Sequence, residues 1–243
     1  MALLSVRLEE NTRRAIRRAL AAGTLRAAIV PVASTEQHNE HLALNHDTQA
    51  TLWLACKAAE AVFPAAVVTP PISIGLSEHW MEHPGTLTLT PETFAQVVFE
   101  VCHSLRRHGV TRIMILNGHG GNRRTLERNL ENFRRRLGAR LVLCSYWEAY
   151  TAETIPRTLV TGECPGHAGE FETSVALAAF PDAVHALVEP YPESELRISE
   201  PSHAADDRRF FAGAQHASRE KGLLLLEIAV RWLTTRLGEL LAD

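Results

Sequence analysis

No two cysteines in this sequence are spaced as C-x-x-C, although four are present, at positions 56, 102, 144 and 164. The first three fall within apolar helix or strand patterns, so we interpret them as buried free thiols in a reducing compartment. No stretch approaches the ~20 apolar residues that a membrane-spanning helix needs. The N-terminus also lacks the apolar run and the cleavage site of a signal peptide. These absences predict a cytoplasmic protein without a membrane partner.

An excess of charge of one sign is also lacking. The formal net charge is −3 and 22% of the residues are charged, which gives no reason to expect a nucleic acid as a partner. The basic run 134–136 lies in a helical pattern, and we interpret it as a solvated helix face. The chain has 243 residues, of which 46% are hydrophobic. This composition suits one large α/β domain over residues 1–243.

Short apolar segments alternate with longer amphipathic ones along the chain. This alternation predicts a single three-layer α/β domain, with a mostly parallel sheet flanked by helices. We expect strands at 26–33, from 67, at 111–117 and at 139–147, and helices at 9–22, 47–62, 90–109, 123–137, from about 168, and at 217–240. Ligands of such sheets bind at the carboxyl ends of the strands. The polar segment 190–216 is a surface excursion, a lid or an oligomer contact, and its sequence does not distinguish these.

Histidines concentrate in the loops that follow the expected strands. Seven of the 12 lie there or at the start of the helix near 168: residues 38, 41, 46, 79, 83, 119 and 167. The first of these loops, STEQHNEHLALNHD, also contains Glu36, Glu40 and Asp47. Carboxylates and imidazoles are the usual ligands of zinc, manganese and iron. Glu36 and His38 are two residues apart, so in an extended segment they face one side. Asp47 either bridges two metals or caps the helix that starts there.

Two later motifs add similar side chains. The turn Asn117–Asn122 contains three glycines and directs His119 from a strand end. Neither phosphate-loop pattern fits this turn, so we interpret His119 as a metal ligand. His167 and Glu170 are three residues apart, which places them on one face of a helix. The alternative, a helix start with acids that suit the helix dipole, explains the acids but not the histidine.

Taken together, these motifs resemble one known family. The segments PVASTEQH (31–38), His-Asp (46–47), NGHGGN (117–122) and HAGEFETS (167–174) are similar to those of the creatininase, or creatinine amidohydrolase, family, in order and spacing over residues 28–180. The resemblance implies two divalent cations per chain, zinc, manganese or iron. It also implies a homo-oligomer, with a hexamer as the common form.

The resemblance further implies which residues bind the cations. Glu36, Asp47 and His119 would bind one, and His38 and the bridging Asp47 the other. Some members of the family supply a carboxylate two residues after the histidine of N-G-H. That position is Gly121 here, so Glu170 is expected to supply the missing ligand. Glu172 is expected to anchor the site or contact substrate, and His167 to lie near the reacting centre.

These residues predict metal-assisted hydrolysis of an amide C–N bond in a small polar substrate, cyclic amides included. His167 would give a proton to the leaving group, and activity would fall below about pH 6 because the histidine ligands must be neutral. His79, Trp80 and Trp147 are candidates for a substrate pocket; a surface loop with one anchoring tryptophan is the alternative.

Asn39 and Gly121 depart from the family pattern, which argues against creatinine itself as the substrate. One alternative function is hydrolysis of a peptide, or of a C–C bond in a cyclic ketone. A catalytically silent metal-binding homologue is a further alternative.

Overall fold

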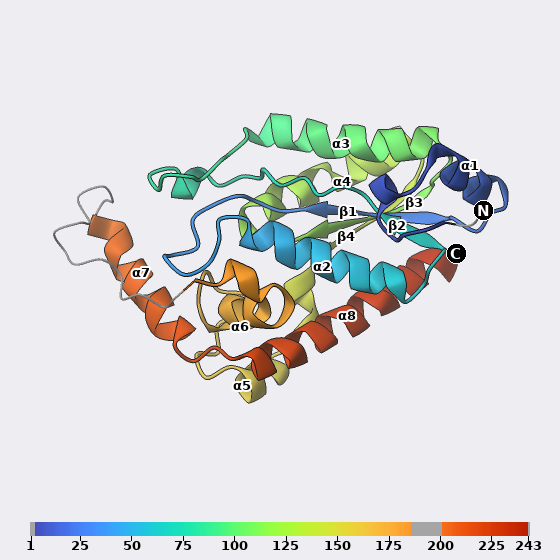
Figure 1. The fold of residues 1–243 in the computed structure, drawn as a ribbon. Helices are drawn as coiled ribbons and strands as arrows, with labels where there is room; N and C mark the ends of the chain where they lie inside the picture. The colour runs from blue at the N-terminus through green and yellow to red at the C-terminus, as the bar shows by residue number, and fades with distance from the viewer. Residues whose placement is uncertain (1–2, 186–200, 243) are drawn as a thin grey trace.

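The sheet is parallel and lies between two layers of helices (Figure 1). The computed structural model describes residues 3–185 and 201–242. The strand order is β2-β1-β3-β4, with β1 at Ala27–Val32, β2 at Ala66–Val68, β3 at Arg112–Asn117 and β4 at Arg140–Ser145. Each neighbouring pair is parallel, and in the central pair Ile29 lies opposite Met114. The predicted α/β architecture is confirmed.

The alternation of side chains along β1 and β3 divides the core in two. Ile29 and Met114 lie in one buried cluster, whereas Val30 and Ile115 lie in the other, as expected when successive side chains point to opposite faces. The first cluster is covered by α2 (His46–Glu60), α6 (Glu170–Ala179) and α8 (Arg219–Ala242). The second is covered by α1 (Arg13–Ala21), α3 (Pro91–Arg107) and α4 (Arg123–Leu137).

Helix boundaries lie close to those predicted from capping residues. The hydroxyl of Thr90 accepts a hydrogen bond from the Thr93 amide, 3.2 Å away, at the start of α3. Gly138 ends α4 in the left-handed region, with φ of 54°. The short helices were not predicted; they are η1 (Leu8–Glu10), η2 (Glu78–Trp80), η3 (Gly120–Asn122), η4 (Tyr146–Ala149), α5 (Thr154–Thr158) and η5 (Pro181–Ala183).

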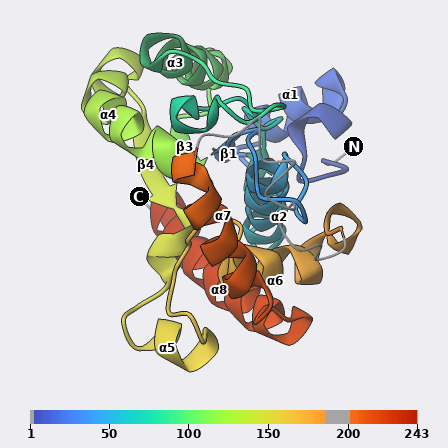
Figure 2. The same ribbon diagram turned by 90° about the vertical axis from the view of Figure 1, so that its left-hand side faces the viewer.

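The loops after the strands gather at one end of the sheet, and the two chain ends lie at the opposite end (Figure 1). Helix α7 (Pro201–Ala214) crosses in front of the sheet at the loop end (Figure 2). It accounts for part of the segment 190–216, whose residues 190–200 lie outside the described part of the chain. No helix among the described residues is long and apolar enough to cross a membrane.

Candidate metal centre

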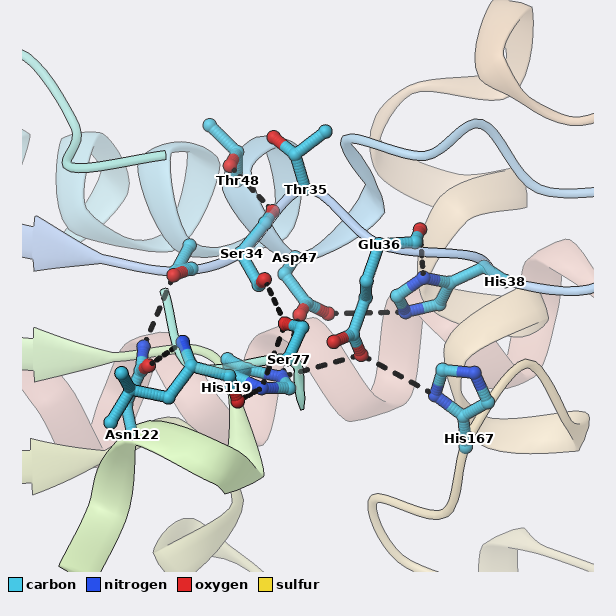
Figure 3. Close-up of polar contacts among 12 residues, drawn as sticks. Ser34, Thr35, Glu36, His38, Asp47, Thr48, Ser77, His119, Asn122 and His167 are labelled. Atoms are coloured by element: carbon cyan, nitrogen blue, oxygen red, sulfur yellow. Dashed lines mark hydrogen bonds and ion pairs between the residues drawn. The ribbon is translucent and has the colours of Figure 1, made fainter. Parts of the chain in front are cut away.

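Side chains from four segments meet at the carboxyl ends of β1 and β3 (Figure 3). Glu36 and His38 follow β1, Asp47 lies in the first turn of α2, and His119 follows β3. His167 lies in the loop before α6. All five are buried or nearly so; the Asp47 side chain is 3% exposed and that of His167 is 13% exposed. Except for Glu170, the residues predicted to bind metal come together here.

The two carboxylate oxygens of Asp47 face two different histidines. Oδ1 lies 3.2 Å from Nε2 of His38, and Oδ2 lies 3.1 Å from Nδ1 of His119. The N-cap residue of α2 is Asn45, which makes no side-chain capping bond, and among the described residues Asp47 Oδ2 has no hydrogen-bond partner. This geometry favours a bridge between two cations over the capping alternative.

Both of these histidines donate their other ring N–H to a backbone carbonyl. His119 Nε2 lies 3.0 Å from the Leu76 carbonyl oxygen, and His38 Nδ1 lies 3.2 Å from the Glu36 carbonyl oxygen. In the neutral rings, Nδ1 of His119 and Nε2 of His38 therefore carry lone pairs. Each lone pair is directed at carboxylates, an arrangement that is repulsive unless a cation or a proton lies between them. Metal-binding histidines are oriented in this way by their second nitrogen.

The site has two halves, one around His119 and one around His38, and each contains a further carboxylate. Glu36 Oε1 lies 3.3 Å from His119 Nδ1 and 3.7 Å from His167 Nδ1. Glu172 Oε2 lies 3.6 Å from His38 Nε2 and accepts a hydrogen bond from the Ala168 amide at 2.6 Å. Glu172 thus faces the cluster from the first turn of α6.

Negative charge is in excess at this centre. Glu36, Asp47 and Glu172 are each at most 5% exposed, and within residues 3–185 and 201–242 none of them pairs with a lysine or arginine. Buried carboxylates need a compensating charge. Glu36 Oε2 also lacks a hydrogen bond to any part of the chain that the structure describes. Divalent cations would supply both the charge and the missing partners, so the residues present fit a metal centre.

The pKa values reflect the same imbalance. Burial opposes the charged form of His38, but Asp47, Glu172 and Glu36 outweigh it and raise its pKa to about 10. Burial of His119 is likewise outweighed by Asp47 and Glu36, and its pKa rises to about 9. Burial raises the pKa of Glu172 to about 8, although His38 opposes the shift. Without metal, protons would therefore occupy the positions where cations would bind.

Glu170 is not part of this cluster, which corrects the expected ligand set. Its carboxylate accepts hydrogen bonds from the amides of Val160, at 3.1 Å, and Thr161, at 2.8 Å, and forms an ion pair with Lys221. Glu170 and Glu172 are two positions apart on α6, about 200° around the helix axis, so the two side chains point to different sides. Glu172 faces the cluster in place of Glu170.

Gly121 cannot hold a side chain in this backbone conformation. A Cβ atom there would overlap the Leu76 carbonyl oxygen and lie 2.5 Å from His119 Nε2. On the same side of the cluster, a ring nitrogen of His79 lies within 4.8 Å of donor atoms of Glu36 and His119. The His79 ring also stacks on that of His119, with centroids 5.9 Å apart. His79, one of the three residues expected to contact substrate, thus lies beside the candidate metal centre.

His167 is held in one tautomer. The Oε1 atom of Gln37 accepts from the Asn39 amide at 2.9 Å, which turns the Gln37 NH₂ group toward His167 Nε2, also at 2.9 Å. The ring therefore carries its proton on Nδ1. Burial, with help from nearby His38, lowers the pKa of His167 well below its usual value. His167 is thus a neutral hydrogen-bond donor at pH 7.

A pocket opens over the centre. Trp80 stacks on His167, with ring centroids 4.6 Å apart, and Phe210 of α7 meets the same ring edge-on at 5.2 Å. The pocket is lined by Glu36, Asp47, His79, Trp80, Gly118, His119, Gly120, Gly121, Trp147, Pro165, Gly166, His167 and Glu172. His79, Trp80 and Trp147, the three residues predicted to contact substrate, therefore line one pocket. The alternative, a surface loop with one anchoring tryptophan, explains why Trp80 is buried but not why all three line the same pocket.

The remaining loop residues have other surroundings. His41 is buried, and its Nε2 lies 2.8 Å from the Thr173 hydroxyl. His83 packs edge-on against Trp80, and Glu40 is exposed. Sequence reasoning missed Gln37 and Phe210. Gln37 lies within the quoted E-Q-H motif, which is a signal that could have identified it, whereas Phe210 has no local signal.

Comparison with known proteins identifies the family. The family model described as Creatininase, creatinine amidohydrolase, matches residues 9–237. The chain belongs to the creatininase family. The creatinine amidohydrolase of Pseudomonas putida is 28% identical over 238 residues, which are 87% of this chain and 88% of that protein. The mycofactocin precursor peptide peptidase of Mycolicibacterium smegmatis is 34% identical over 160 residues, 64% of this chain and 59% of that protein.

Solved structures agree with this membership. A structure described as "Creatininase Mn" superposes with a TM-score of 0.81 at 28% identity, covering 97% of this chain and 98% of that one. The expected family and fold are thereby confirmed. The expectation of a hydrolase that acts on C–N bonds is confirmed at the level of the family, and divalent metal binding is supported by the manganese form and by the ligand groups described above.

Proposed function

We propose that this chain, acting as one domain, hydrolyses an amide C–N bond of a small polar molecule with the help of two divalent cations. Glu36, Asp47 and His119 would hold one cation, and His38, Asp47 and Glu172 the other. One observation carries the proposal: the lone pairs of His38 and His119 are both directed at Asp47, one at each carboxylate oxygen. With neutral rings these contacts are repulsive, and two cations, one at each Asp47 oxygen, would make both of them attractive.

When bound, two such cations supply a nucleophile at neutral pH, by lowering the pKa of water from about 15.7 to ~7, and polarise the scissile carbonyl. In the net reaction, the hydroxyl group of water ends on the carbonyl carbon, the C–N bond breaks, and the proton ends on the leaving nitrogen. We assign His167 the role of a hydrogen-bond donor to the reacting amide. It would donate its Nδ1–H, because Gln37 occupies its other ring nitrogen. This assignment replaces the expected transfer of a full proton from His167, whose lowered pKa keeps the ring neutral.

The pocket walls suggest the substrate class. Trp80 and Trp147 line the pocket together with His79 and His167, which suits a planar amide flanked by aromatic surfaces. The name of the P. putida relative supports a cyclic amide, and that of the M. smegmatis relative supports a peptide. Hydrolysis of a C–C bond in a cyclic ketone and a catalytically silent homologue are the remaining alternatives. The complete ligand set argues against a silent homologue.

The test compares metal content and turnover in the same preparations. Apo protein is loaded with Zn²⁺, Mn²⁺ or Fe²⁺ and assayed against cyclic amides, including creatinine, and against short peptides and cyclic ketones. Asp47→Asn should lose both cations and all turnover, because it weakens both halves of the site. Glu40→Gln, which changes an exposed carboxylate of the same loop, should retain both. Turnover in metal-free protein, or full metal content in Asp47→Asn, would contradict the proposal. The cytoplasmic location and the homo-oligomer stay predictions.

A further inference from the structure

His46 is a buried histidine with no evident structural role. It is the first residue of α2, directly before Asp47, and only 1% of its surface is exposed. Neither of its ring nitrogens has a hydrogen-bond partner within residues 3–185 and 201–242. Its contacts include the Phe180 ring, met edge-on with centroids 5.4 Å apart. Leaving a polar group buried and unpaired destabilises the folded state, and a bound cation would offset this penalty.

His41 shows what a structural histidine looks like in this loop. It is as buried as His46, but its Nε2 is paired with the Thr173 hydroxyl at 2.8 Å. It also lies outside every group of side chains that is positioned to hold an ion among the described residues. The contrast between His41 and His46 therefore lies in their partners and not in their burial.

The donor atoms around His46 form a compact set. One ring nitrogen of His46 and donor atoms of His38, Asp47 and Glu172 all lie within 4.8 Å of one another. The rings of His38 and His46 are 4.9 Å apart and are tilted rather than stacked. Two imidazoles and two carboxylates match the nitrogen and oxygen donors, and the four-coordinate preference, of zinc.

We propose that His46 is the fourth protein ligand of the cation at His38, Asp47 and Glu172. This inference rests on the proposed function and makes the two halves of the site unequal. Two of the four donors in the His46 half, His38 and His46, do not line the pocket, whereas Asp47 and Glu172 do, as do Glu36 and His119 of the other half. With four protein ligands the His46 half is closed, like a structural zinc site, and the other half, with three, keeps an open position for water and substrate. One cation should be bound tightly, and the other should exchange.

The first test measures metal affinity and apo stability together in His46→Leu. Zn²⁺ is titrated into apo protein by calorimetry in competition with a chelator, and the Tm of the apo protein is recorded. The tight Kd should weaken by at least the ~10- to 100-fold that loss of an outer partner of a ligand costs. The apo Tm should rise, because an unpaired buried imidazole is removed. If His46 had only a structural role, His46→Leu would leave the tight Kd unchanged and lower the apo Tm.

His41→Leu is the matched control, a buried histidine of the same loop. It should lower the apo Tm, because it removes the bond to Thr173, and leave both Zn²⁺ affinities unchanged. His46→Cys gives a second readout that does not depend on comparing stabilities. With Co²⁺ in place of Zn²⁺, a thiolate at position 46 should add a sulfur-to-cobalt charge-transfer band to the near-ultraviolet spectrum.

These measurements distinguish failure of the proposed function from failure of the His46 assignment alone. If wild-type protein binds no cation, the proposed function fails and the inference with it. If wild-type protein binds two cations and His46→Leu binds both with unchanged Kd, only the role of His46 is overturned. Absence of the charge-transfer band in a His46→Cys protein that holds Co²⁺ in the closed site overturns it as well.

Discussion

Replacement of Glu170 by glutamine tests whether this carboxylate stabilises the fold or binds a metal ion. The Glu170 carboxylate accepts hydrogen bonds from Val160 and Thr161 and pairs with Lys221. Its side chain has no exposed surface, whereas the Lys221 side chain is 25% exposed. Glutamine keeps one acceptor oxygen, but it removes the charge and turns an NH₂ group toward donors. The change should therefore destabilise the protein without affecting metal binding.

The magnitude follows from the burial of the pair. Removing one partner of a fully buried ion pair costs ~3–5 kcal/mol. Lys221 keeps contact with water and still donates to the His216 carbonyl oxygen at 2.7 Å, so we expect the lower end, ~3 kcal/mol. For a chain of this size, each kcal/mol lowers the Tm by about 2–4 °C, which gives a decrease of ~6–12 °C.

The pH dependence of this effect has a definite sign. Burial opposes ionisation of Glu170, but Lys221 and the two amides outweigh it and lower its pKa from 4.5. A carboxylate with a lowered pKa stabilises the folded state above its unfolded pKa, and this contribution is lost as the pH falls through the folded pKa. The difference between wild type and Glu170→Gln should thus be full at pH 7 and shrink below about pH 4.5.

Chemical denaturation of apo protein and elemental analysis of metal-loaded protein measure the two effects. Lys221→Met serves as the control, because it removes the same ion pair without altering any carboxylate; it should also destabilise the protein and leave metal content unchanged. If Glu170→Gln lost a cation while its apo stability remained that of wild type, Glu170 would be a ligand after all, and the ligand set proposed above would be wrong.

Three further changes test other parts of the site. His119→Ala should lose the cation of the open half and keep that of the closed half, as read from metal content; two cations per chain in this variant would refute the assignment. Gly121→Ala should weaken metal binding in the open half, because its Cβ would crowd Leu76 and His119, and a calorimetric Kd equal to that of wild type would show that the loop adapts. The pKa values of about 10 for His38 and about 9 for His119 exceed the unfolded value of 6.5, so their contribution to apo stability is full below pH 6.5 and is lost as the pH rises through 9–10. Because cations displace these protons, the metal Kd should tighten between pH 6.5 and 9, by about tenfold per pH unit for each proton released; a Kd independent of pH would contradict this linkage.

Much of the fold could be predicted from the sequence because local signals coincide with tertiary structure here. Thr90 and Pro91 mark the start of α3, and the apolar segment 111–117 is buried on both faces, as a central parallel strand must be. Leu226, Leu233 and Leu237 of α8 recur at helical spacing and are at most 3% exposed, whereas Leu223 of the same helix is 44% exposed. Helix α7 was missed because its segment, 190–216, consists mostly of polar residues.

The candidate site could be predicted only in part. Glu36, His38, Asp47 and His119 follow strand ends, and strand ends in a parallel sheet converge. The choice between Glu170 and Glu172 depends on which face of α6 turns toward the sheet, and Lys221, 51 residues from Glu170, helps to decide it. His46 adjoins Asp47 in sequence, but its unpaired nitrogens are a property of the packed core. Long-range packing of this kind leaves no trace in a short motif.

Anomalous X-ray scattering from crystals grown with Zn²⁺ or Mn²⁺ tests the central claim most directly, because it gives the number of cations and their ligands together. We predict two anomalous peaks per chain on either side of the Asp47 carboxylate, one beside Glu36 and His119 and the other beside His38 and Glu172. A single peak, no peak, or two peaks that do not share Asp47 would contradict the account.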